Sequence, residues 1–136
     1  MSDVDAGVDV STKPRLILVV EDEAVIRDFI CEILNDEGLQ TEHAENADVA
    51  LEYLNQHSDE VCLLLTDIYM PGSMNGAELA NLSAGRWPEI PVMITSGHET
   101  PQSSGVTNPV VFLRKPWSIG QLIDSVNLAI VQNTPG

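Results

Sequence analysis

The chain has 136 residues, 43% of them hydrophobic and 20% charged, which predicts a single globular domain. Six basic and 21 acidic residues give a net charge of −15, and a surface of this charge repels nucleic acids and anionic membranes. We therefore expect no nucleic acid and no membrane among its partners, but metal cations or proteins with basic docking surfaces.

The ends of the chain differ from its middle. Residues 1–13 are rich in Asp and poor in large apolar side chains, which predicts a disordered acidic tail before a domain at 14–131, and 132–136 predict a frayed C-terminus. No apolar run approaches the ~18 residues that span a membrane, and the N-terminus lacks a secretory signal pattern. Cys31 and Cys62 lie in apolar segments without metal-ligand spacing, which indicates free thiols in a reducing compartment. We therefore expect a cytoplasmic protein.

The first half of the domain predicts a strand, a helix, an edge strand and a second helix. Residues 15–20, RLILVV, form the continuous apolar run of a strand buried on both faces. A helix is predicted over 23–38, with Gly38 placed to end it. Its predicted inward stripe consists of Ile26, Phe29, Ile30, Ile33 and Leu34. Residues 40–44 are polar, as suits a sheet edge, and 46–56 predict a short helix.

The second half predicts three further buried strands, at 61–67, 90–96 and 109–115. Helices are predicted at 76–84 and at 118–131, the latter with Ser118 as its N-cap. Residues 97–108, where a further helix is expected, contain Pro, Gly and Ser without apolar periodicity and predict a loop or a single turn. Alternation of apolar strands with helices is typical of an α/β doubly wound parallel sheet.

Polar residues follow the buried strands at their carboxyl ends, where ligands bind in open parallel sheets. These residues are Glu21-Asp22-Glu23, Thr66-Asp67, Thr95-Ser96 and Lys115-Pro116. We therefore expect carboxylates, a hydroxyl and an ammonium to converge at one edge of the sheet.

This set of groups suits phosphoryl chemistry. Carboxylates from Asp22 and Asp67 are the hard oxygen ligands that Mg²⁺ prefers, and the ion allows neighbouring carboxylates to stay ionised. An ionised Asp67 beside Mg²⁺ and Lys115 is able to accept a phosphoryl group, and a hydroxyl can hold the product.

Over about residues 15–131, the chain resembles the receiver domain of bacterial two-component response regulators, in particular single-domain, chemotaxis-regulator-like members. The family's acidic pair is matched by Glu21 and Asp22 in LVVEDE, and its phosphorylated aspartate by Asp67 in TDIYMPG. Its hydroxyl residue is matched by Thr95 in ITSG, and its lysine by Lys115 in LRKPW. The resemblance implies a flavodoxin-like five-stranded parallel sheet in the order 2-1-3-4-5, here with the fourth helix short or replaced by a loop.

The resemblance also implies a metal site. Mg²⁺, or Mn²⁺, would be held by Asp22, Asp67 and the backbone carbonyl of Tyr69, with Glu21 acting through water. Glu23, next along the chain, is better explained as an acid favoured at a helix N-terminus than as a ligand.

Roles in transfer and switching follow from the same resemblance. Lys115 would contact the phosphoryl oxygens, and the Lys115–Pro116 peptide would be cis. Thr95 would move toward the phosphoryl group, and Phe112 would then turn inward and alter the adjacent surface. Two features depart from the common family pattern: Phe112 has no hydroxyl, and the loop MPGSMNG at 70–76 is one residue longer.

The sequence therefore indicates a phosphoacceptor response regulator, a signalling protein that catalyses only its own phosphorylation and dephosphorylation. Its expected partners are a histidine kinase or phosphotransfer protein and an unknown downstream protein. The chain could equally be a receiver from a longer protein such as a hybrid kinase. Alternatives are a binding module that works without phosphorylation and an aspartyl-phosphate hydrolase, against which Tyr69 argues because such enzymes carry an acid at that position.

Overall fold

A computed structural model describes residues 16–70, 72–97, 105–107 and 110–132. Within them, five strands form one parallel sheet in the order β2-β1-β3-β4-β5, which confirms the predicted fold class. The strands are β1 (Leu16–Val20), β2 (Gln40–Ala44), β3 (Val61–Asp67), β4 (Val92–Ser96) and β5 (Val111–Arg114).

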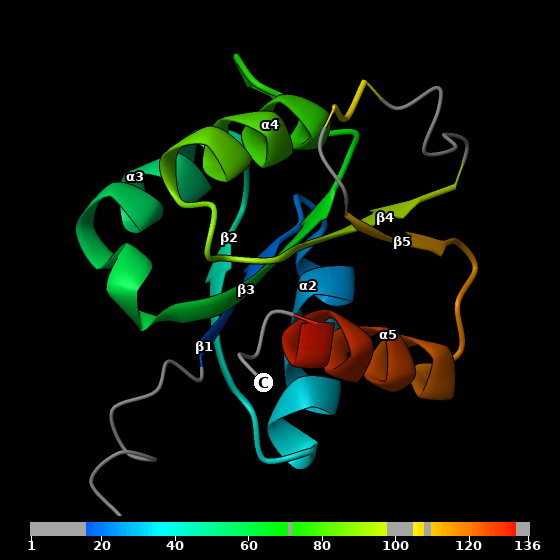
Figure 1. The fold of residues 1–136 in the computed structure, drawn as a ribbon. Coiled ribbons are helices and arrows are strands. Elements are labelled where there is room, and N and C mark those ends of the chain that lie inside the picture. The colour runs from blue at the N-terminus through cyan, green and yellow to red at the C-terminus, as the bar shows by residue number, and fades with distance from the viewer. Residues whose placement is uncertain (1–15, 71, 98–104, 108–109, 133–136) are drawn as a thin grey trace, which may run out of the picture.

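Helices cover both faces of the sheet, α2 and α5 on one and α3 and α4 on the other (Figure 1). They are α2 (Ala24–Asp36), α3 (Ala47–His57), α4 (Gly76–Arg86) and α5 (Ile119–Gln132), with a short 3₁₀ turn η1 (Ser58–Glu60) before β3. Helix α5 thus includes Gln132, one residue past the predicted domain end. The predictions for the tail at 1–13 and for 133–136 lie outside the described residues.

Alternate residues of the central strands lie in two apolar cores, one on each face of the sheet. Ile17 and Val19 of β1 pack with α2 and α5, whereas Leu18 and Val20 pack with α3 and α4. All four side chains are buried, so the strand reads as a continuous apolar run rather than an alternating one. The sheet is therefore held in place from both sides, and its carboxyl edge presents the residues that follow the strands.

Between β4 and β5, the described residues contain no helix. Gly97 and residues 105–107 are irregular, as predicted, and Val110 is irregular too although a strand is predicted from 109, while 98–104 and 108–109 lie outside the described part. Asn81 of α4 holds this connection in place: its amide donates to the Gly105 carbonyl (2.9 Å) and accepts from the Thr107 N–H (2.8 Å).

The predicted inward position of Phe29 is wrong. Ile30, Ile33 and Leu34 of the same stripe are buried and Ile26 is half-buried, but Phe29 is 44% exposed. Its ring stacks on Trp117, with centroids 6.3 Å apart and planes 10° from parallel. The Phe29 ring therefore packs on Trp117, just before α5, and not in the core.

Helix ends follow the predicted signals. Ser118 caps α5: its hydroxyl accepts from the Gln121 N–H (3.1 Å), and the Gln121 side chain accepts from the Ser118 N–H (2.8 Å). Gly38, just after α2, has a φ of +84°, the left-handed conformation that favours glycine at this position.

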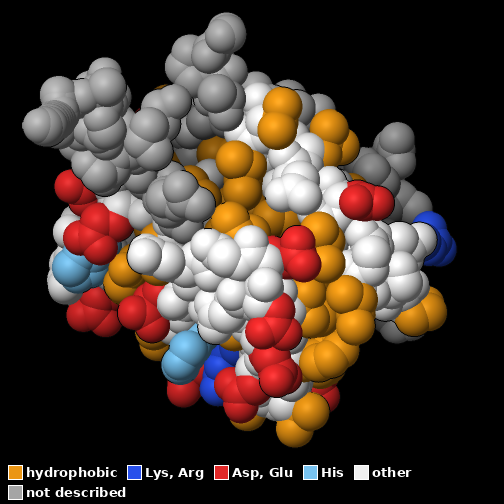
Figure 2. Space-filling model, turned by 90° about the horizontal axis from the view of Figure 1, so that it is seen from below, with side chains coloured by type: hydrophobic (Ala, Val, Ile, Leu, Met, Phe, Trp, Pro, Cys, Tyr) orange, Lys and Arg blue, Asp and Glu red, His pale blue; other side chains and the backbone are white. Residues whose placement is uncertain are grey.

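Charge on the surface is mostly negative. On the face shown in Figure 2, acidic side chains are spread widely and basic ones are few. In the described part of the chain, no helix is long and apolar enough to cross a membrane.

Candidate functional site

Three carboxylates meet at the carboxyl edge of the sheet. Glu21 follows β1 directly, Asp22 comes next, and Asp67 is the last residue of β3. Because β1 and β3 are neighbours in the sheet, one carboxylate oxygen of each residue lies within 4.8 Å of the others. The predicted convergence is confirmed for these residues, which we call the acidic edge.

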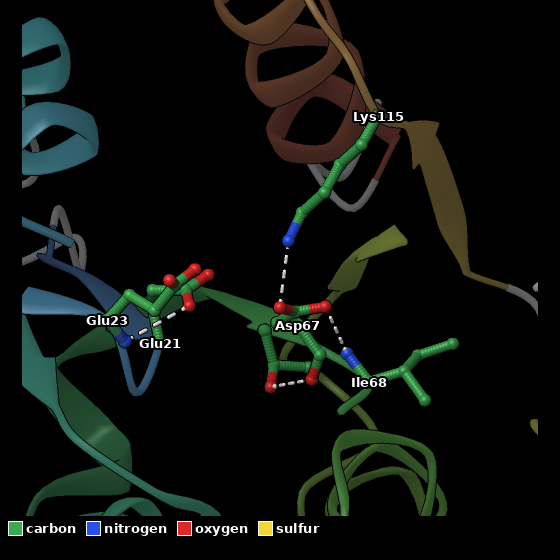
Figure 3. A network of polar contacts seen from close by, with 6 residues as sticks. Glu21, Glu23, Asp67, Ile68 and Lys115 are labelled. Atoms are coloured by element: carbon green, nitrogen blue, oxygen red, sulfur yellow. Dashed lines mark hydrogen bonds and ion pairs between the residues drawn. The ribbon is translucent and has the colours of Figure 1, made fainter. Parts of the chain in front are cut away.

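Asp67 is nearly buried, at 8% exposure, and both of its carboxylate oxygens accept hydrogen bonds. Oδ1 accepts from the backbone N–H of Ile68 (2.7 Å). Oδ2 accepts from Nζ of Lys115 (2.8 Å), whose side chain reaches over from the end of β5 (Figure 3). The Lys115–Pro116 peptide is cis, as expected.

Lys115 keeps its charge in this setting. Burial by itself would lower the pKa of its ammonium, but the hydrogen bond and the negative charge of Asp67 outweigh this effect and raise the pKa above its ordinary value. The site thus contains a fixed positive charge in contact with the central carboxylate.

Glu21 is the most buried acid of the edge, at 1% exposure, and its carboxylate accepts from the Glu23 N–H (3.2 Å). Burial, and next the negative charge of Asp67, raise the pKa of Glu21 to about 7. A divalent cation would offset this repulsion, and the ligands it would meet are all hard oxygens. The donor set therefore fits Mg²⁺ or Mn²⁺.

Thr95 lies on β4, the strand next to that of Asp67, and Phe112 lies on β5, one strand further away. Thr95 is buried and pairs in register with Asp67 across β3 and β4. Phe112 pairs with Ile94 and packs half-buried against the core under α3 and α4. The register places Thr95 beside Asp67 and Phe112 one strand beyond β4, and their switching roles stay predictions.

The two ends of the connection from β3 to α4, residues 68–75, are joined by a backbone hydrogen bond. The Gly76 N–H donates to the Ile68 carbonyl (2.9 Å), and a Cβ at position 76 would lie 1.8 Å from the Asp67 carbonyl oxygen. Tyr69, in this connection, is 58% exposed, and the predicted use of its carbonyl as a metal ligand stays a prediction.

Sequence reasoning missed two residues that hold the site's loops. Nη1 of Arg27 donates to the Glu21 carbonyl (2.9 Å), and Asp48 accepts from both the N–H and the hydroxyl of Ser73. Neither position carries a motif. The sequence therefore carries no signal that would have singled them out.

A parallel sheet of this order, with a buried aspartate and a lysine at its carboxyl edge, is the architecture of a receiver. The chain matches the response regulator receiver domain over residues 17–127 and belongs to that family.

Several known response regulators are similar to the chain. It is 33% identical over 111 residues to the nitrogen assimilation regulatory protein NtrX of Azorhizobium caulinodans, covering 79% of this chain and 24% of that protein. It is also 33% identical over 125 residues to the phosphate regulon transcriptional regulatory protein PhoB of Escherichia coli, covering 89% and 54%. The chain thus spans about a quarter to a half of the curated relatives it matches.

Solved structures agree. The receiver domain of NtrX from Brucella abortus superposes with a TM-score of 0.76 at 34% identity, over 85% of this chain and 98% of that one. A CheY-like receiver domain from Methanospirillum hungatei shares the fold at 23% identity, with a TM-score of 0.77 over 88% and 96%.

Proposed function

We propose that this receiver domain is a phosphoacceptor whose Asp67 takes a phosphoryl group from the phosphohistidine of a histidine kinase or phosphotransfer protein. The observation that carries the proposal is the 2.8 Å contact between Lys115 and Asp67 within the acidic edge. A structural carboxylate would need only the lysine, whereas the two further acids beside it can bind a cation, which would in turn offset the charge of a transferred anionic group.

In the transfer step, an oxygen of Asp67 forms a bond to phosphorus as the phosphorus–nitrogen bond of phosphohistidine breaks. The imidazole leaves with the electron pair and takes up a proton. The Lys115 ammonium offsets negative charge on the phosphoryl oxygens, and the Thr95 hydroxyl donates a hydrogen bond to the phosphoryl group of the product. A divalent cation, Mg²⁺ or Mn²⁺, would be held by Asp22, Asp67 and the Tyr69 carbonyl, with Glu21 acting through water, and would supply further positive charge to the transfer.

The phosphorylated state acts by changing protein binding. Thr95 lies beside Asp67 on β4 and Phe112 lies on the next strand, β5, so in this proposal a shift at Thr95 is transmitted to the surface near β5. In this proposal the chain is a signalling protein and not an enzyme for other substrates. It works on a downstream protein, either by itself or as the receiver part of a longer protein such as a hybrid kinase.

The alternative is a receiver-like module that binds partners without phosphorylation. In that case Asp67 and its lysine would serve stability alone, and Asp67→Asn would leave partner binding unchanged. The burial of Asp67 among two other acids favours the phosphoacceptor, because a purely structural site gains nothing from that repulsion.

Acetyl phosphate with Mg²⁺ tests the proposal directly. We expect intact mass spectrometry to show one added phosphoryl group, lost in Asp67→Asn and when EDTA replaces Mg²⁺. Asp59→Asn, a change at an exposed acid of η1, is the matched control and should be modified like the wild type. Modification that persists in Asp67→Asn would reject the assignment.

A further inference from the structure

Arg27 makes a contact that the phosphoacceptor mechanism does not use. Its Nη1 donates to the backbone carbonyl of Glu21 at 2.9 Å, from the second turn of α2. This carbonyl belongs to the peptide unit that joins Glu21 to Asp22. The guanidinium therefore holds the one peptide plane whose rotation sets the directions of two acids of the acidic edge.

The rest of Glu21 is also held. Its N–H donates to the Ala44 carbonyl of β2 (3.1 Å), and its carboxylate accepts from the Glu23 N–H (3.2 Å). Arg27 completes this set by binding the carbonyl. Because Glu21 is 1% exposed, a carbonyl that loses this donor cannot simply turn to water and is drawn to rotate toward another donor, taking Asp22 with it.

The position of the charge is also informative. The described residues contain four basic side chains, Arg27, Arg86, Arg114 and Lys115. Two of them serve the acidic edge, Lys115 at Asp67 and Arg27 at Glu21. Arg27 is half-buried, and within the described part its Nε is buried and has no hydrogen-bond partner. A guanidinium that only anchored α2 would gain more at the surface, where its other donors would be hydrated.

We propose that Arg27 is a positioning residue of the divalent-cation site. By holding the peptide between Glu21 and Asp22, it keeps both carboxylates directed toward Asp67 before the ion arrives. This inference rests on the proposed function, since it assigns Arg27 a role in binding the cation that the phosphoacceptor requires. Residues that orient ligands in this way commonly change metal affinity by about 10–100-fold when they are replaced.

A structural role in packing α2 on the sheet is the competing explanation, and two measurements on the full chain separate the roles. The first is the Kd for Mg²⁺ alone, by isothermal titration calorimetry without any phosphodonor. The second is the melting temperature in EDTA. A packing role alters only the second, whereas a positioning role alters the first.

Three variants at position 27 divide the contact into its parts. Arg27→Met removes the donor and the charge, Arg27→Gln keeps a donor without charge, and Arg27→Lys keeps the charge with a shorter reach. Arg86→Met is the matched control, because Arg86 lies in the last turn of α4 and its Nη1 bonds Asn55. We expect Arg27→Met to raise the Kd for Mg²⁺ about tenfold. The Kd of Arg27→Lys should lie between those of Arg27→Met and the wild type. The Kd of Arg86→Met should equal that of the wild type.

The outcomes are distinct. A Kd for Arg27→Met equal to that of the wild type overturns the inference and leaves the proposed function intact. A wild type that does not bind Mg²⁺ overturns both. If Arg27→Met does not fold, Arg27→Lys decides: a raised Kd with an unchanged melting temperature supports positioning, and an unchanged Kd refutes it.

Discussion

Asp67 explains why an apolar strand ends on a charge. Its carboxylate is buried because it closes β3 between two neighbouring strands, and it is stabilised by the Ile68 N–H and the Lys115 ammonium. Isolated, such a charge would be costly to bury. The cost is offset by groups that only the sheet brings together, since Lys115 is 48 residues away along the chain.

Gly76 is required by the site at the same scale. An added Cβ would meet the Asp67 carbonyl oxygen at 1.8 Å. That oxygen and the Gly76 Cα that would carry the Cβ both belong to the backbone, which cannot give way easily. We expect Gly76→Ala to lower the free energy of unfolding by roughly 1–3 kcal/mol or more, as overpacking does. Urea denaturation in EDTA measures this change.

Gly85 offers the control within the same helix. Nothing lies within 4 Å of a Cβ at this position, which is exposed near the end of α4. Alanine there restricts the unfolded chain and improves helix propensity, so Gly85→Ala should raise the free energy of unfolding by about 0.5–1 kcal/mol. Equal effects of the two substitutions would contradict the close contact at Gly76.

At the scale of elements, the long connection between β3 and α4 is tied to α3. Asp48, in the first turn of α3, accepts from the Ser73 N–H (3.2 Å) and from its hydroxyl (2.7 Å). Gly72 precedes this contact with a φ of +115°, and a Cβ there would lie 2.9 Å from Asp48 Oδ2. The loop is thus fixed to the neighbouring helix through Asp48 and Ser73.

A double-mutant cycle tests this tie. Asp48→Ala and Ser73→Ala should each destabilise the protein, and together by less than their sum, with a coupling of about 0.5–1.5 kcal/mol. Urea denaturation of the four proteins provides the free energies. Glu52→Ala, an exposed acid one turn further along α3, should be additive with Ser73→Ala. A coupling of the same size with Glu52 would mean that the effect is charge alone.

For the whole molecule, the net charge of −15 is the dominant feature. Self-repulsion destabilises the compact state, and salt screens it over a Debye length of about 10 Å at 0.1 M. We expect the EDTA-treated protein to melt about 3–6 °C higher in 0.5 M than in 0.02 M NaCl, which corresponds to about 1 kcal/mol.

A melting temperature that falls with NaCl would show that attractive ion pairs outweigh this repulsion. The described contacts argue against that outcome. Among the described residues, ion pairs join Lys115 to Asp67 at the site and His57 to Glu60, and the second is charged only when the histidine is protonated. Repulsion among the many exposed acids therefore has few opposing pairs within the described part of the chain.

The order and type of the elements could be predicted because apolar periodicity depends on which side of each element is buried. Runs such as RLILVV and VCLLLTD are buried on both faces, so they show no alternation, and the helices show a stripe. The site was predictable for a related reason. In a parallel sheet the strands end at the same edge, so the residue after each strand, such as Glu21 or Lys115, is placed by topology alone.

Only the tertiary structure decided how neighbouring elements meet at their margins. Phe29 faces Trp117 and not the core, Arg27 binds the Glu21 carbonyl, and Asp48 binds Ser73. These contacts depend on the angle between packed elements and on the path of a loop, which periodicity does not encode because it records burial and not partners. The sequence by itself determined the family, the sheet and the acidic edge, while packing decided which side chains hold that edge in its geometry.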